Sequence, residues 1–139
     1  MRSLVASLLL ASGATALQLS AFTTMRPAAS ARTSVAVMGL EDDIKETITK
    51  NKVVMYSKSS CPFCNQCKGL FEDKGILDGA TVVELDLVDG GQEIQDALLA
   101  MTGQRTVPNV FVGGVHVGGN DDTQKAAKSG KLDELLASA

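Results

Sequence analysis

All three cysteine residues of this chain lie in one short stretch, SKSSCPFCNQC (57–67), and they follow one another at three-residue spacing as Cys61, Cys64 and Cys67. An apolar run of β-forming residues, VVMY, precedes the stretch and indicates a buried strand. A helical pattern begins at Pro62, because proline favours the first helical position, where its missing N–H has no partner anyway. The sequence therefore predicts Cys61 at the N-cap of a helix that directly follows a strand.

This position predicts a reactive thiol. At an N-cap the Cys61 sulfur faces unpaired backbone N–H groups and the positive end of the helix dipole, which favour thiolate over thiol. Lys58 adds a positive charge nearby, and Cys64 lies one helical turn further on, within reach of the same sulfur. A Cys-x-x-Cys pair at such a junction is typical of reversible disulfide exchange.

Two metal sites compete with this interpretation. The Cys-x-x-Cys-x-x-Cys spacing also fits the cysteine run of iron–sulfur proteins, but those clusters take four thiolates and this chain has no fourth. A zinc site with three cysteines and one histidine would need His116, the only histidine, which lies 49 residues beyond Cys67 without a spacing signature. We expect no metal, and we interpret His116 as a surface residue.

Cys67 needs a separate interpretation. It shares an apolar helical stripe with Leu70 and Phe71, and free cysteine packs well as a small hydrophobic residue. We expect Cys67 to be buried. A secondary redox or regulatory role stays open, because Cys64 lies three residues earlier on the same face.

The rest of residues 39–139 alternates between helical and strand patterns, which predicts one α/β domain with a parallel strand pair and a terminal hairpin. Gly75 and Gly103 mark helix ends, Gly113-Gly114 marks the hairpin turn, and Asn120 is the expected cap of a last helical pair. In chain order the expected elements are a helix at 39–51, a strand at 53–56, a helix from 62 to about 75, a strand at 81–88, a helix around 94–103, two strands within 109–119, and the helical pair from 120 to the end.

Residues 1–38 differ in composition from the rest and predict a targeting presequence. They contain three arginines but no Asp, Glu or Lys. Residues 1–21 combine Arg2, an apolar core and small residues, as a secretory signal does, whereas residues 22–38 are rich in Ala, Ser and Thr, as a transit peptide is. In series they resemble the bipartite plastid presequences of algae with secondary plastids, in which a Phe such as Phe22 begins the transit part. A secretory protein and a mitochondrial presequence are the alternatives.

Charge and hydropathy exclude two classes of partner for the remaining chain. Residues 39–139 carry ten basic and sixteen acidic side chains, and phosphate binding requires clustered Lys and Arg, so we expect no nucleic acid partner. No stretch is long and apolar enough for a transmembrane helix, so we expect no membrane association of the mature form.

Three motifs in fixed order resemble the glutaredoxin family, dithiol class. They are CPFC at 61–64, RTVPNVFVGG at 105–114 and GGNDD at 118–122, and the resemblance covers residues 39–139. Thioredoxin itself fits less well, because no Trp precedes the first cysteine. The resemblance implies a thioredoxin fold, with a four-stranded mixed sheet flanked by helices.

The resemblance also implies a glutathione site. Val107 would pair with the backbone of glutathione beside a cis Pro108, the Asp121 and Asp122 segment would bind its γ-glutamyl end, and Lys58 and Gln95 would hold its glycine carboxylate. The complete expected set is Lys58, Phe63, Gln95, Arg105, Thr106, Val107, Pro108, Gly119, Asn120, Asp121 and Asp122.

The implied activity is reduction of protein–glutathione mixed disulfides and protein disulfides, with Cys61 as nucleophile, Cys64 as resolving thiol and glutathione as electron donor. The expected partners are glutathione and glutathionylated or disulfide-containing proteins, and the expected state is a monomer. The alternative is a [2Fe–2S] carrier or sensor, in which the first cysteine and glutathione ligate a cluster between two protomers. Those proteins usually have Gly or Ser after the first cysteine, where this chain has Pro62.

Overall fold

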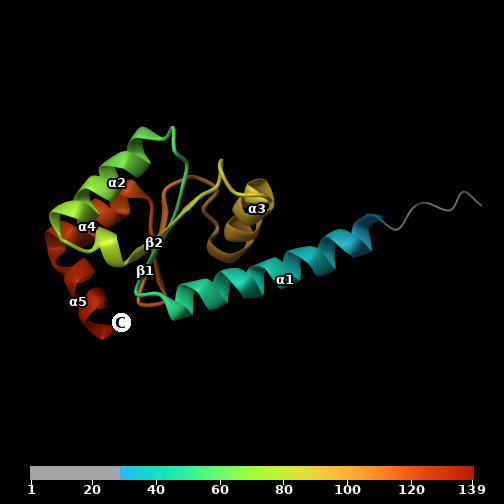
Figure 1. The fold of residues 1–139 in the computed structure, drawn as a ribbon. Coiled ribbons are helices and arrows are strands. Elements are labelled where there is room, and N and C mark those ends of the chain that lie inside the picture. The colour runs from blue at the N-terminus through green and yellow to red at the C-terminus, as the bar shows by residue number, and fades with distance from the viewer. Residues whose placement is uncertain (1–28) are drawn as a thin grey trace, which may run out of the picture.

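In the computed structural model, the backbone is described for residues 29–139 and the side chains for residues 39–139. The fold is a four-stranded mixed sheet in the order β2-β1-β3-β4, flanked by helices (Figure 1), as the sequence predicts. β1 pairs parallel with β2 and antiparallel with β3, and β3 pairs antiparallel with β4. The elements are α1 (Ala29–Lys50), β1 (Val53–Ser57), α2 (Pro62–Asp73), the 3-10 turn η1 (Leu77–Gly79), β2 (Ala80–Glu84), α3 (Gly91–Thr102), β3 (Asn109–Val112), β4 (Val115–Gly118), α4 (Asn120–Ser129) and α5 (Lys131–Ser138).

Helices cover both faces of the sheet. In Figure 1, α2, α4 and α5 lie on one side, and α1 and α3 lie on the other. The central strand β1 therefore sends successive side chains into two different cores. Val54 and Tyr56 pack against α1 and α3, whereas Val53 and Met55 pack against the opposite helices. Because both faces of β1 are buried, its sequence is apolar without alternation.

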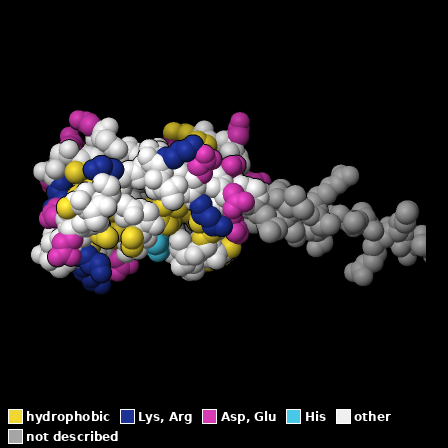
Figure 2. Space-filling model, turned by 90° about the horizontal axis from the view of Figure 1, so that it is seen from below, with side chains coloured by type: hydrophobic (Ala, Val, Ile, Leu, Met, Phe, Trp, Pro, Cys, Tyr) yellow, Lys and Arg dark blue, Asp and Glu magenta, His cyan; other side chains and the backbone are white. Residues whose placement is uncertain are grey.

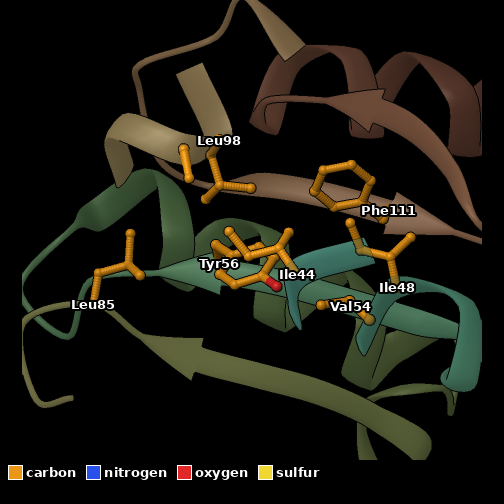
Figure 3. Packing of buried hydrophobic residues seen from close by; sticks show 8 residues of the cluster. Ile44, Ile48, Val54, Tyr56, Leu85, Leu98 and Phe111 are labelled. Atoms are coloured by element: carbon orange, nitrogen blue, oxygen red, sulfur yellow. The ribbon is translucent and has the colours of Figure 1, made fainter. Parts of the chain in front are cut away.

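The core between the sheet and α1 and α3 is shown in Figure 3. Ile44 and Ile48, one helical turn apart on α1, meet Leu98 of α3 over the sheet. Tyr56 and Phe111 from adjacent strands pack edge to face, with ring centroids 6.1 Å apart. An edge-to-face pair places the positive edge of one ring against the negative face of the other, which stabilises the contact.

The opposite core contains Cys67. This side chain and Phe71, one turn further along α2, are fully buried against the sheet together with Ala126 of α4 and Leu132 of α5. The prediction that Cys67 is a core residue is confirmed. These contacts fix α2 to the sheet, so that the first turn of α2 lies at the carboxyl end of β1.

The second strand is shorter than the sequence predicts. The expected strand at 81–88 is wrong beyond Glu84, because residues 85–88 form a turn in which Leu87 is 73% exposed. The apolar alternation continues, but the Leu85 N–H makes the last bond to β1, at Ser57 O. The chain then turns into α3, and Gly91 is required there because a Cβ atom would lie 1.8 Å from Leu85 O.

Two helix starts also differ from expectation. The first helix begins at Ala29 rather than near residue 39, since the intervening ASARTSVAVM contains no Gly or Pro to stop it. The expected cap at Asn120 is wrong by one residue: Gly119 is the N-cap of α4, and Asn120 is already helical and buried.

The targeting prediction falls mostly beyond the described part of the chain. Residues 1–21 and 22–28 lie outside the described residues, and the domain boundary at 38/39 stays a prediction. Among the helices that the structure describes, none combines the length and apolar character needed to cross a membrane.

Candidate active site

Cys61 occupies the N-cap of α2, as predicted. Its backbone is extended, at φ −87° and ψ 118°, and Pro62 follows at the start of the helix. The turn from β1 is closed by the Cys61 N–H, which donates to Lys58 O at 3.1 Å. The Cys61 carbonyl then accepts the Asn65 N–H at 3.2 Å, which begins the helical bonding. The thiol is partly exposed at the N-terminal end of α2.

The surroundings of Cys61 favour its thiolate. Partial burial by itself would raise the pKa of the Cys61 thiol and is the largest single influence, but the hydrogen bonds and the charge around the sulfur together outweigh it. The Cys64 backbone N–H and the Cys64 thiol both point to this sulfur, and the Phe63 N–H adds a third bond. The positive charge of Lys58 acts in the same direction, so the net pKa of Cys61 lies below its ordinary value.

The other two thiols respond in the opposite way. Burial raises the pKa of Cys64, and its hydrogen bond and proximity to Cys61 raise it further. Burial raises the pKa of Cys67 to about 11. Among the three, only Cys61 is both partly exposed and shifted towards thiolate, which is the combination that makes a cysteine nucleophilic.

The turn that carries Cys61 is held by Asp86. Its carboxylate accepts the Ser59 backbone N–H at 2.9 Å (Oδ1) and 3.2 Å (Oδ2), and it also accepts the Ser59 hydroxyl. These bonds from the Ser59 hydroxyl and N–H lower the pKa of Asp86. Asp86 was not predicted as a site residue, because the apolar alternation of residues 81–88 predicts a strand there and not the turn that follows β2.

A second loop faces Cys61. The Val107–Pro108 peptide bond is cis, as the family resemblance implies, and Val107 O lies 3.8 Å from the Cys61 sulfur. Gln104 braces this loop, since its Nε2 donates to Thr106 O at 3.0 Å and to Pro108 O at 2.9 Å. Gln104 was also missed; its only signal in the sequence is its position directly before the RTVP motif.

A groove of about 430 Å³ opens beside the Val107–Pro108 loop, and it unites two of the three sequence motifs with Phe63 of the third. Eight of the eleven residues expected at a glutathione site line it, together with Gln104. Gly118 allows close approach of Asp122, a lining residue: its φ is +123°, and a Cβ atom there would lie 2.6 Å from Asp122 Oδ2. The lining residues are Phe63, Gln104, Thr106, Val107, Pro108, Gly119, Asn120, Asp121 and Asp122.

The remaining three expected residues form a hydrogen-bonded chain of their own. Lys58 Nζ donates to Gln95 Oε1 at 3.0 Å, and Gln95 Nε2 donates to Arg105 O at 2.6 Å. The Arg105 guanidinium lies 3.5 Å from Asp96, and both side chains are largely exposed. Gln95 thus links the Lys58 side chain of the Cys61 turn to the backbone of Arg105, next to the Pro108 loop.

His116 lies apart from the cysteines. Its Nε2 and Asn109 Oδ1 are 2.7 Å apart, and its ring packs on Phe111. Within residues 39–139 no three or more His, Cys, Asp or Glu side chains gather as a metal site. Figure 2 shows basic and acidic side chains interspersed over the face it displays, without the basic stripe that a nucleic acid backbone requires.

Comparison with known proteins places these features in one family. The glutaredoxin family model matches residues 53–117. Glutaredoxin-C8 of Oryza sativa is 50% identical over 93 residues, covering 67% of this chain and 68% of the relative. Glutaredoxin-C6 of the same species is 53% identical over 95 residues, covering 68% of this chain and 83% of the relative. The alignment with mitochondrial glutaredoxin-2 of Homo sapiens, at 48% identity, covers 68% of this chain and only 57% of the relative.

Solved structures of glutaredoxins share the fold of this chain. A wheat glutaredoxin superposes with a TM-score of 0.67 at 49% identity, covering 72% of this chain and 92% of that chain. A buckwheat glutaredoxin–glutathione complex superposes with a TM-score of 0.69 at 39% identity, covering 73% and 90%.

Proposed function

Because this chain belongs to the glutaredoxin family of glutathione-dependent thiol–disulfide oxidoreductases, we propose that Cys61 is its nucleophile and Cys64 its resolving thiol. The observation that carries the proposal is the environment of Cys61. It is the one cysteine with a lowered pKa and a partly exposed sulfur, and it lies opposite the cis Val107–Pro108 bond that borders the groove.

The first reaction needs only Cys61. Its thiolate attacks the glutathione sulfur of a protein–glutathione mixed disulfide, and the protein thiolate leaves and takes up a proton. Cys61 then carries the glutathione as a mixed disulfide. A second glutathione thiolate attacks that glutathione sulfur, oxidised glutathione leaves, and the Cys61 thiolate is restored. Glutathione is the electron donor, and two glutathione molecules leave joined by a disulfide bond.

The second reaction uses both cysteines. Cys61 attacks a protein disulfide and forms a mixed disulfide with one of its sulfurs, while the other leaves as a thiolate. Cys64 then attacks Cys61, so that a Cys61–Cys64 disulfide forms and the reduced protein is released. Two glutathione molecules reduce the Cys61–Cys64 bond. The position of Cys64, within hydrogen-bonding reach of Cys61 and buried from solvent, supports this role.

We place glutathione in the groove. Val107 offers its backbone to the peptide, as an added strand would be bound, and the α4 N-terminus with Asp121 and Asp122 faces the γ-glutamyl end. Lys58 and Gln95, which are hydrogen-bonded to each other, would hold the glycine carboxylate, with Arg105 beside them. The buckwheat relative with bound glutathione supports this assignment.

Carriage of a [2Fe–2S] cluster is not favoured. Such a cluster would need the Cys61 thiolate as a ligand, and Cys64, one turn further along α2, offers a competing thiol beside it. Pro62 additionally fixes the backbone directly after Cys61. We therefore propose no metal cofactor.

We further propose that the protein acts as a monomer on glutathionylated or disulfide-containing proteins, and that it is imported into a plastid. The signal-like and transit-like parts of residues 1–38 support import into a plastid. Relatives include plant and mitochondrial glutaredoxins, so the proposal of a plastid rests on residues 1–38 and not on the domain.

The test is glutathione-dependent reduction of a glutathionylated peptide, coupled to glutathione reductase. We expect Cys61→Ser to abolish the activity and Cys64→Ser to retain it, since the first reaction needs one thiol. Activity that survives Cys61→Ser, or wild-type protein that is inactive, would contradict the proposal.

A further inference from the structure

Ser57 is a buried polar residue that the reaction as described does not use. It is the last residue of β1, its exposed fraction is 0%, and its hydroxyl forms no hydrogen bond of regular geometry among the described residues. A buried hydroxyl without a partner destabilises the folded state, so its presence needs a reason.

Ser57 follows Val53 and Met55 at two-residue spacing, so its side chain lies on the face of the sheet that α2 covers, beside the first turn of α2, which carries Cys64. Both side chains are fully buried, one at the end of β1 and the other in the first turn of α2. Burial raises the pKa of Cys64, and both the Ser57 hydroxyl and the Lys58 backbone N–H act in the opposite direction. Two donors therefore converge on a sulfur that is neutral in the reduced protein.

In the resting state the Cys64 thiol stays protonated. Its interaction with Cys61 lowers the pKa of Cys61 and raises that of Cys64. When Cys61 becomes part of a mixed disulfide its negative charge disappears, and Cys64 no longer has an anion to bond to. The Cys64 proton then passes to solvent, and the buried thiolate that remains needs hydrogen-bond donors.

We propose that the Ser57 hydroxyl is the side-chain donor that stabilises the Cys64 thiolate in the two-cysteine reaction. In the forward step, the Cys64 thiolate attacks the Cys61 sulfur, the Cys61–Cys64 bond forms, and the bond from Cys61 to the substrate breaks. The substrate sulfur leaves as a thiolate and takes a proton from solvent. In the reverse step, glutathione thiolate attacks Cys61 and Cys64 leaves as a thiolate, again bonded to Ser57. This inference rests on the proposed role of Cys64.

The first test isolates Cys64. The titratable side chains around it are Cys61 and Cys67, and both are removed with Cys61→Ser and Cys67→Ala, while the charged Lys58 stays in place. The ultraviolet absorbance of the thiolate is then followed against pH. We expect Ser57→Ala to move the midpoint to higher pH and Ser57→Thr, which keeps a hydroxyl, to restore it. Thr81→Val removes a hydroxyl from the neighbouring strand β2 and is the matched control.

The second test measures the reaction in protein that retains all three cysteines. We expect Ser57→Ala to slow formation of the Cys61–Cys64 disulfide by about 10-fold, because hydrogen bonds to charged groups are stronger than neutral ones. An unchanged thiolate midpoint in Ser57→Ala, or a shift of equal size in Thr81→Val, would overturn the inference. If the wild type reduces no glutathionylated peptide, the proposed function fails instead, whatever the titration of Cys64 shows.

Discussion

Cys61 and Cys67 lie six residues apart on one helix, and the structure gives their thiols opposite properties. Cys61 ends the strand-to-helix turn, where unpaired N–H groups, a neighbouring thiol and Lys58 lower its pKa. Cys67 packs between the sheet and α4, where burial raises its pKa to about 11. The residue type is the same, so the difference comes from position. Several donors at the helix start outweigh desolvation at Cys61, whereas the hydrogen bond from Thr123 does not offset burial at Cys67.

The largest expected effect comes from leaving only one of these thiols in the protein. A variant that keeps only Cys61 (Cys64→Ser, Cys67→Ala) should reduce a glutathionylated peptide at a rate near that of wild type. A variant that keeps only Cys67 (Cys61→Ser, Cys64→Ser) should be slower by on the order of 10³-fold or more, because its thiolate is buried and scarce. Comparable activity of the two variants in the coupled glutathione reductase assay would break the comparison.

A smaller effect should appear in the free energy of unfolding, where substitution of Cys67 should cost more than substitution of Cys61. Cys67→Ala removes a buried sulfur from the core and should lower the free energy of unfolding by about 1–2 kcal/mol. Cys61→Ala is the matched control, since the Cys61 side chain makes no capping hydrogen bond and is partly exposed. It should change stability by less than about 0.5 kcal/mol. Urea unfolding of both variants checks this, and equal losses would show that Cys61 is also a packing residue.

The smallest effect should come from Lys58. Its charge is the weakest of the influences that lower the pKa of Cys61, so Lys58→Gln should raise that pKa slightly. Because Lys58 is also proposed to hold the glycine carboxylate, the KM for glutathione should rise and kcat/KM should fall about 3–5-fold. Lys50→Gln, an exposed lysine at the end of α1, is the control. A loss as large as that of Cys61→Ser would mean that Lys58 has a direct role in the chemistry.

Sequence patterns predicted the parts of this site that depend on local structure. The N-cap position of Cys61 follows from a strand, a cysteine and a proline in succession, and the burial of Cys67 follows from an apolar stripe. The end of β2 could not be predicted in this way, because Leu87 and Val88 continue an apolar pattern that the structure leaves exposed in a turn.

The residues that were missed fall into two kinds. Asp86 bonds Ser59 across 27 residues of chain, and no spacing rule links such a pair, because the distance depends on the elements between them. Gln104 bonds Thr106 and Pro108 nearby in the chain, but those bonds depend on the irregular conformation of the Pro108 loop, which no periodic pattern encodes. The family motifs predicted which residues line the groove. The hydrogen bonds that hold those residues in place could be identified only in the folded structure.

The most direct test of the central claim is the pH dependence of alkylation at each cysteine, read by mass spectrometry of the wild-type protein. We predict that Cys61 reacts at pH 7 and reaches its full rate at a lower pH than an ordinary cysteine does. Cys67, with a pKa of about 11, should carry a thiolate fraction of roughly 10⁻⁴ at pH 7 and stay unmodified. If Cys61 titrates like an ordinary thiol, or if Cys67 reacts alongside it, the helix position does not control reactivity and the account is contradicted.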